Sequence, residues 1–136
     1  MGVDSMANID VVIADEQPLS LIGMRSAVAD QSDIRIVAEC ENPRCLAEVV
    51  RRHPPNVLLV SGELLRDEFG ALKQLVSQIK KTHVIVVTSH KDRGFLDGAL
   101  RCGANGVIHT ECPIEEIPAA IRKVTSGGVW LERAAA

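Results

Sequence analysis

The sequence predicts a doubly wound α/β fold, in which helices cover both faces of a parallel sheet. Five short apolar runs rich in β-branched residues alternate with longer segments of helical period, which is typical of βαβ units. A length of 136 residues, with 46% hydrophobic and 24% charged residues, fits one compact domain. The predicted strands are Ile9 to Ala14, Ile34 to Glu39, Asn56 to Val60, His83 to Thr88 and Gly106 to Thr110.

The first two helices are delimited by prolines. Pro18 has the fixed φ that suits an opening turn, so the first helix is expected to begin just after it and to run to about Ala29. The second takes Pro43 to Arg52 and stops before two further prolines, because a proline moves the residue before it out of helical conformation.

The remaining three helices follow from an apolar stripe and from glycines. Leucine, valine and isoleucine recur at helical spacing over 72–79, which predicts the third helix. The fourth covers Asp92 to Arg101, with Gly103 as a left-handed cap. The fifth opens at Pro113 and ends at a Ser-Gly-Gly sequence, and Pro118 inside it predicts a kink or a tightened first turn.

Charge and hydropathy exclude several classes of function. A formal net charge of -3 without a basic patch makes this segment a poor nucleic-acid binder. No run approaches the roughly 20 apolar residues of a membrane span, and residues 1–9 lack the layout of a signal peptide. The sequence therefore predicts a cytoplasmic domain without a membrane partner.

The cysteines predict neither a disulfide nor a metal site. No two of them have CxxC spacing, so we expect small buried side chains in a reducing compartment. His109 and Cys112 come nearest to a ligand pair, but no second pair at zinc-finger spacing accompanies them. The four cysteines are Cys40, Cys45, Cys102 and Cys112.

Acids and hydroxyls follow the predicted strands at their carboxyl ends, where ligands of such sheets gather. Asp15 and Glu16 have the oxygen ligands that Mg²⁺ prefers, but an acidic pair stabilising the start of the next helix is the favoured interpretation from the residues alone. No glycine-rich phosphate-binding motif follows any strand. The other polar residues at these ends include Ser61, Thr88 and Thr110.

Five segments, in this order and spacing, resemble bacterial response-regulator receiver domains of the NarL/LuxR type, from Ile9 to about Leu131. They are IADEQPLSLIGMRSAV at 13–28, HPPNVLLV at 53–60, VIVVTSHKD at 84–92, ALRCGANGVIHT at 99–110 and PIEEIPAAIRKVTSGGVWL at 113–131.

The resemblance implies a flavodoxin-like (CheY-like) fold, with a five-stranded parallel sheet in the order 2-1-3-4-5. It also implies a receiver domain over 9–131, preceded at 1–8 by a disordered N-terminus or tag. Residues 132–136 are then expected to start a linker to a C-terminal domain of the helix-turn-helix type, through which alone the protein would bind DNA; a stand-alone receiver is the alternative.

In that family an acidic pair binds Mg²⁺, an aspartate after the third strand is phosphorylated, a Thr or Ser after the fourth follows the phosphate, and a lysine after the fifth pairs with it. Asp15, Glu16 and Thr88 match this pattern. Three positions depart from it: Ser61 stands at the phosphoacceptor, Thr110 at the lysine, and Leu65 at the proline that usually follows.

These departures predict a receiver that is not switched by aspartyl phosphorylation, because an acyl phosphate needs a carboxylate nucleophile, a metal and a fixed cation. Asp67 and Glu68 lie downstream and are not expected to reach the pocket. We expect no required cofactor, Mg²⁺ affinity that is at most weak, and no enzymatic activity. A phosphorylation-competent switch with an unconventional pocket and a flavodoxin-like enzyme remain as alternatives.

Histidines bear on the enzyme alternative, which needs a nucleophile paired with a base. His90 and His109 are the two that could lie near the pocket. Strand alternation predicts that the side chain of His109 points to the opposite face from Thr110.

Leu21 and Ile22 predict an interface on the first helix. The apolar residues of this helix exceed the stripe that one sheet face requires, and Leu21 and Ile22 are surplus to it; the residues left for the inner stripe are Leu19, Met24, Ala27 and Val28. If they are exposed, we expect a homodimer or a partner contact through this helix, with the fifth helix beside it. A sensor kinase or another signalling protein is a further expected partner. Trp130 is expected to anchor the end of the domain by packing.

Overall fold

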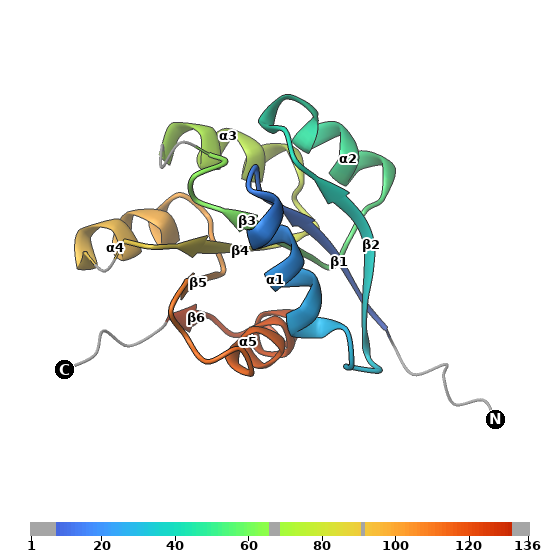
Figure 1. The fold of residues 1–136 in the computed structure, drawn as a ribbon. Coiled ribbons are helices and arrows are strands. Elements are labelled where there is room, and N and C mark those ends of the chain that lie inside the picture. The colour runs from blue at the N-terminus through green and yellow to red at the C-terminus, as the bar shows by residue number, and fades with distance from the viewer. Residues whose placement is uncertain (1–7, 66–68, 91, 132–136) are drawn as a thin grey trace.

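A computed structural model describes residues 8–65, 69–90 and 92–131. Its centre is a six-stranded sheet in the order β2-β1-β3-β4-β5-β6, with every pair parallel (Figure 1). The strands are β1 (Ile9–Ala14), β2 (Ile34–Cys40), β3 (Val57–Ser61), β4 (His83–Thr88), β5 (Gly106–His109) and β6 (Trp130–Leu131). The helices are α1 (Pro18–Val28), the 3₁₀ helix η2 (Pro43–Cys45), α2 (Leu46–Arg52), α3 (Phe69–Gln78), α4 (Arg93–Arg101) and α5 (Glu116–Thr125).

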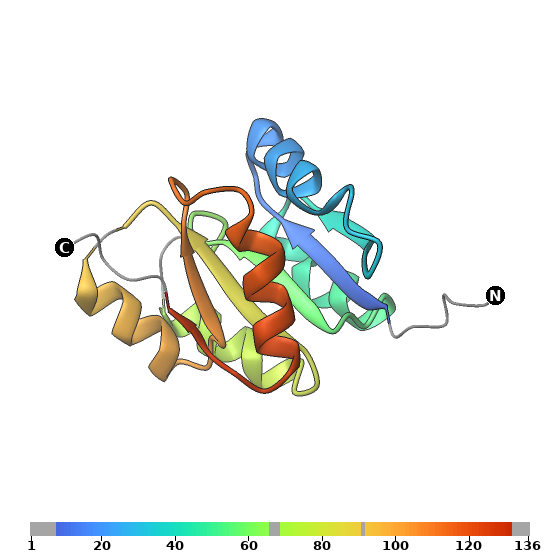
Figure 2. The same ribbon diagram turned by 90° about the horizontal axis from the view of Figure 1, so that it is seen from below.

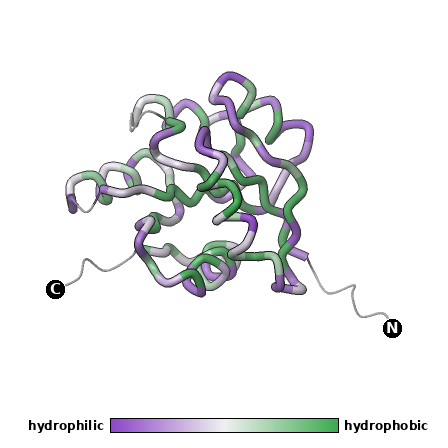
Figure 3. Tube along the Cα trace, in the orientation of Figure 1, coloured by the Kyte–Doolittle hydropathy of each residue, from purple (hydrophilic) through white to green (hydrophobic). Residues whose placement is uncertain are grey.

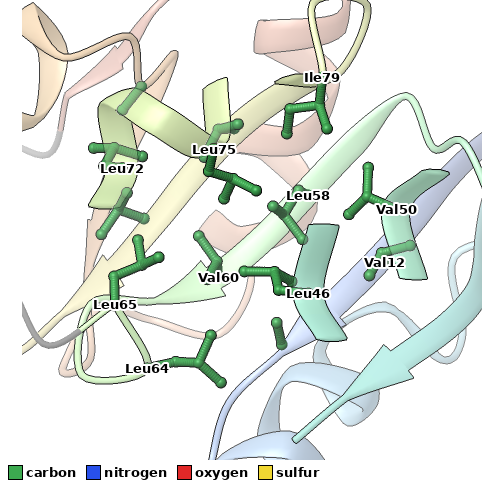
Figure 4. Close-up of a cluster of buried hydrophobic side chains, with 14 of the residues drawn as sticks. Val12, Leu46, Val50, Leu58, Val60, Leu64, Leu65, Leu72, Leu75 and Ile79 are labelled. Carbon is green, nitrogen blue, oxygen red and sulfur yellow. The ribbon is translucent and has the colours of Figure 1, made fainter. Parts of the chain in front are cut away.

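Helices lie on both faces of the sheet, as predicted. Helices α1 and α5 cover one face, and Figure 2 shows α5 crossing the strands; α2, α3 and α4 lie on the other. Successive residues of a strand point to opposite faces, so Val11 and Ile13 pack with α1 and α5 while Val12 and Ala14 pack toward α2 and α3. Figure 4 shows the cluster between the sheet, α2 and α3.

The central strands contribute many of the fully buried side chains of the core. Residues 57–60 of β3 are fully buried, and each such Val or Leu contributes roughly 1.5–3 kcal/mol to folding. The same strands form the continuous hydrophobic centre of the trace in Figure 3. A strand buried on both faces has an uninterrupted apolar sequence, which is why the position of β3 could be predicted from the sequence.

The strand order 2-1-3-4-5 is confirmed, and the sheet carries one strand more than predicted. In β6, Trp130 and Leu131 pair with Gly106 and Val107. Two residues are too few for a pattern of period two to be recognised. Trp130 packs against the core on the α1 and α5 side, which confirms its expected role as an anchor.

Two predicted helix starts are wrong. The segment Pro43–Cys45 forms a 3₁₀ turn, in which the side chain of Asn42 accepts the Arg44 N–H at 2.8 Å, and α2 begins only afterwards. Before α5, the N–H of Glu116 bonds the carbonyl of Pro113 at 2.9 Å in another tight turn. Pro118 consequently lies in the first turn of α5, where its missing donor has no intrahelical partner to lose.

Other local expectations are confirmed by the backbone and by burial. Gly103 ends α4 with a φ of 112°, the left-handed cap that was predicted. Leu72, Leu75 and Ile79 form the buried stripe of α3 and of the turn after it. Among the described residues no helix is long and apolar enough to cross a membrane.

Burial of the cysteines differs from the expectation. Cys40 is buried, but Cys45 is exposed and the other two are half-buried. The expectations for residues 1–7 and 132–136, and for Asp67 and Glu68, fall outside the described residues.

Candidate functional site

The carboxyl ends of the central strands surround a cleft of about 530 Å³. Asp15 follows β1, Ser61 ends β3, Thr88 ends β4 and Thr110 follows β5, and all four line this cleft as the sequence predicted. The first three are at most 5% exposed, whereas Thr110 is exposed at the rim. Glu16 is exposed and is absent from the lining, so the acidic pair is divided between the cleft and solvent.

Asp15 is the buried acid of the cleft. Its Oδ1 accepts the N–H of Gln17 at 2.9 Å, and its own N–H donates to the carbonyl of Cys40 at 3.0 Å. Burial raises the pKa of the Asp15 carboxyl, against the opposing effect of hydrogen bonds from the Gln17 amide and the Ser20 hydroxyl. The carboxylate is therefore charged at a cost in free energy, with no fixed cation beside it in the lining.

Ser61 acts as a turn residue. Its Oγ accepts the N–H of Glu63 at 3.1 Å, and its carbonyl accepts the N–H of Leu65. Among the described residues, no carboxylate or imidazole hydrogen-bonds to this hydroxyl, so it lacks the base that activates a serine nucleophile. Leu65, at the position of the usual proline, is buried in the core.

The ends of β4 and β5 are tied together through Thr88. Its carbonyl accepts the N–H of Thr110 at 2.9 Å, and its Oγ1 accepts the N–H of His90 at 3.0 Å. The ring of His90 stacks on that of Phe95, with centroids 4.6 Å apart. The Thr88 hydroxyl is thus held at the floor of the cleft.

His109 lines the cleft together with its two neighbours in the chain, Ile108 and Thr110. Strand β5 ends at His109, so the alternation of faces does not extend to the next residue. The imidazole Nε2 lies 3.0 Å from the carbonyl oxygen of Ser89, and Nδ1 accepts the N–H of Glu111 at 3.0 Å. These contacts fit the tautomer that carries its proton on Nε2.

Glu63 is a cleft residue that was not singled out as a site residue. Its carboxylate accepts the side-chain N–H of Gln17 at 3.0 Å, which joins the loops after β3 and β1. Its position two residues after the end of β3 is the signal that could have found it. With Asp15 it gives the cleft a negative charge, and the described lining contains no lysine or arginine.

This donor set fits a magnesium ion poorly. Among the described lining residues Asp15 is the one buried carboxylate, Glu16 lies outside the lining, and Ser61 supplies a hydroxyl. Within the described ranges, no three His, Cys, Asp or Glu side chains come close enough to hold a metal ion. Magnesium usually requires carboxylate ligands together with several waters or phosphate oxygens.

The interface prediction for α1 is half wrong. Leu21 is 2% exposed and packs into the core with Met24 and Val28, because these positions recur at helical spacing on the inner face. Ile22 is 49% exposed as expected, and Leu19, which was assigned to the inner stripe, is 82% exposed. The outward apolar pair of α1 is therefore Leu19 and Ile22.

Replacement of Asp15 by asparagine is expected to stabilise the domain at about pH 7, raising Tm by roughly 2–5 °C. Burial raises the folded-state pKa of Asp15 above its unfolded-state value. The stability that protonated Asp15 contributes is therefore fully present below the unfolded-state pKa and is lost as the pH rises through the folded-state pKa. Asparagine keeps the acceptor for Gln17 and removes the buried charge.

Thermal unfolding from about pH 3 to pH 7 measures this effect. The difference in Tm between Asp15→Asn and the parent should vanish at the acid end, where the carboxyl of Asp15 is neutral. Asp97→Asn, the same substitution at an exposed position of α4, is the control and should leave Tm unchanged. A variant less stable than the parent at neutral pH would contradict the assignment of a buried, uncompensated charge.

Comparisons with known proteins identify the family. The family model of the response regulator receiver domain matches residues 11–122. Fimbriae Z protein of Salmonella typhimurium is 26% identical over 123 residues, which are 90% of this chain and 59% of that protein. Oxygen regulatory protein NreC of Staphylococcus carnosus is 27% identical over 124 residues, 90% of this chain and 57% of that protein.

Solved structures show the same fold. The isolated REC domain of RcsB from Salmonella enterica serovar Typhimurium, in the apo form, superposes with a TM-score of 0.87 at 20% identity, covering 93% of this chain and 95% of that chain. The receiver domain of NarL from Mycobacterium tuberculosis gives a TM-score of 0.81 at 22% identity, covering 89% and 98%. The chain spans somewhat more than half the length of the curated relatives it matches. With 11–122 matched by the family model and this fold, the chain belongs to the response regulator receiver domain family.

Proposed function

We propose that this chain is a receiver domain that regulates transcription without aspartyl phosphorylation, by dimerising or by binding a partner or ligand. The observation that carries the proposal is the buried hydroxyl of Ser61 at the end of β3, where phosphoryl transfer would need a carboxylate. Its oxygen accepts a backbone N–H and has no base beside it among the described residues. An acyl phosphate cannot form on this side chain.

The charge of the cleft supports the same proposal. A phosphoryl group needs cations around it, and the described lining offers Asp15 and Glu63 but no lysine or arginine. Thr110, at the rim, carries no charge. We propose that the domain requires no cofactor and that Asp15 binds Mg²⁺ at most weakly.

Two alternatives are less well supported. A phosphorylation-competent switch would need another acid in the cleft, and Glu63 is exposed and bonded to Gln17. A flavodoxin-like enzyme would need a nucleophile and base, whereas both ring nitrogens of His109 lie against backbone groups. We propose that the domain is not an enzyme.

The proposed contact surface is the outward face of α1, formed by Leu19 and Ile22. Ile114, which is 48% exposed, lies in the turn before α5 and lines the same cleft as Gly23 of α1. We propose that a second copy of this chain covers the outward face of α1, since a twofold contact buries one short apolar helix face on both copies.

Leu19→Ser combined with Ile22→Ser is expected to weaken self-association by at least about tenfold in Kd while leaving stability within about 0.5 kcal/mol. Sedimentation velocity over a concentration series measures the effect. Val129→Ser, at a position that is 51% exposed outside α1, is the matched control and should leave the dimer intact. Equal loss of association in both variants would count against α1 as the interface.

For the whole protein we propose a further domain, upstream partners and a location by analogy with its relatives. RcsB has been solved in complex with DNA, and the RcsB chain there is longer than this one, which covers 65% of it. By analogy, DNA would be bound by a C-terminal helix-turn-helix domain, with a sensor kinase or another signalling protein as an upstream partner, in the cytoplasm. The acidic receiver itself would not contact DNA.

Exposure to a small-molecule phosphodonor with Mg²⁺ tests the proposed function. Acetyl phosphate at millimolar concentration is the probe, and intact mass spectrometry is the readout. We expect the mass to stay that of the unmodified chain. An added phosphoryl group that hydroxylamine removes would reveal an acyl phosphate on another carboxylate and would overturn the proposal.

A further inference from the structure

Two cysteines at the carboxyl end of β2 lie side by side, apart from the residues that line the cleft. The Sγ of Cys40 donates to the carbonyl oxygen of Asn42 at 3.0 Å, and the Sγ of Cys45 lies 3.7 Å from the same oxygen. The two sulfur atoms therefore share one acceptor, the carbonyl oxygen of Asn42.

The two thiols differ in their access to solvent. Cys40 is 3% exposed, whereas Cys45 is exposed at the end of η2. Burial raises the pKa of the Cys40 thiol, and the neighbouring Cys45 adds to that effect. A dissolved oxidant therefore meets Cys45 first, and Cys40 stands behind it as a shielded second thiol.

We propose that Cys40 and Cys45 form a reversible disulfide when hydrogen peroxide reaches Cys45. The sulfur of Cys45 attacks the peroxide O–O bond, takes up one oxygen as a sulfenic acid and releases one water. The sulfur of Cys40 then attacks the sulfenic sulfur, which forms the S–S bond and releases a second water. The thiols lose two electrons to the peroxide oxygens, and both thiol protons leave in water.

The local structure favours this bond over others. The chain between the two cysteines is short, and its turn is already fixed by the bond from Arg44 N–H to the Asn42 side chain at 2.8 Å. Both sulfurs have to turn from the shared carbonyl oxygen toward one another. Cys102 follows α4 and Cys112 lies in the turn before α5, so they belong to other parts of the fold.

Oxidation of this pair is expected to affect the cleft through one backbone hydrogen bond. The carbonyl of Cys40 accepts the N–H of Asp15 at 3.0 Å, so a change at the end of β2 alters the backbone partner of the buried acid. The amide resonance of Asp15 is thus a reporter of the disulfide. The inference does not depend on the proposed function, because it needs neither the cleft nor a phosphate.

Peptide mapping after peroxide treatment tests the proposal on the full chain. The reduced protein is exposed to a small excess of hydrogen peroxide, remaining thiols are alkylated, and trypsin cleaves after Arg44, between the two cysteines. We expect peptides 36–44 and 45–51 to be joined, two of the four thiols to remain alkylatable, and dithiothreitol to separate the peptides. The Asp15 amide signal should shift with the same time course.

Matched variants sharpen the test. Cys102→Ser with Cys112→Ser should cross-link as the parent does, whereas Cys45→Ser should leave Cys40 alkylatable and slow its oxidation by at least about tenfold. In Cys40→Ala the Cys45 sulfenic acid should persist and be trapped by dimedone. Absence of the joined peptides in the parent, overoxidation of Cys45 beside a reduced Cys40, or a bond to Cys102 or Cys112 would overturn the proposal.

Discussion

Leu21→Glu is expected to lower the free energy of unfolding by roughly 3–5 kcal/mol, enough to unfold much of the population. Leu21 is 2% exposed and packs between α1 and the sheet with Met24, so a carboxylate there loses its hydration without gaining a partner. The neighbouring substitution Ile22→Glu is expected to change stability by no more than about 0.5 kcal/mol, because that side chain is half exposed.

Urea denaturation followed by circular dichroism compares the two variants under identical conditions. The two variants introduce the same charge at adjacent positions of α1, so a difference between their unfolding midpoints reports the difference in burial between Leu21 and Ile22. Similar midpoints for both variants would show that the inner face of α1 has been assigned to the wrong residues.

Ser61→Asp combined with Thr110→Lys is expected to create phosphorylation by acetyl phosphate in a domain that otherwise has none. The aspartate supplies the nucleophile at the end of β3 and a second carboxylate, beside Asp15, for Mg²⁺. The lysine supplies the missing cation at the rim, which neutralises the acids and pairs with the phosphoryl oxygens. Intact mass spectrometry should show one phosphoryl group that requires Mg²⁺ and is labile to hydroxylamine.

Ser61→Asn with Thr110→Lys is the control, since it matches the shape of the aspartate variant but lacks the nucleophile. It should remain unmodified. Ser61→Asp alone is expected to be destabilised, because two carboxylates then share a buried cleft without a cation. If a folded Ser61→Asp, Thr110→Lys variant takes up no phosphate, residues other than Ser61 and Thr110 must also prevent phosphorylation in the cleft.

The fold was largely predictable because its strands are short, buried on both faces and bounded by prolines and glycines. The apolar runs of β1, β3 and β4 carry that signal directly. Helix boundaries were less predictable, since η2 depends on a hydrogen bond from Arg44 to the Asn42 side chain that propensity does not reveal. Strand β6 was missed because two residues have no recognisable period.

The site was predictable in its position and less so in its contacts. Strand ends fix where Asp15, Ser61 and Thr88 lie, because parallel strands bring their carboxyl ends to one edge. Loop residues do not follow strand alternation, so the contacts of His109 with Ser89 and Glu111 could not be predicted from it. The assignment of Leu21 to the surface was wrong because periodicity alone does not fix how a helix is rotated about its axis.

The central claim, that the cleft does not switch on a phosphoryl group, is tested most directly by amide-shift NMR. The probe is beryllofluoride, an acyl-phosphate mimic, added after Mg²⁺, and the reporters are the amides of Asp15, Ser61, Thr88 and Thr110. We predict no saturable shift with beryllofluoride beyond weak ion effects. Saturable shifts that spread from these strand ends to α4 and α5 would contradict the account, because they would show a cleft that still binds the mimic and transmits its presence.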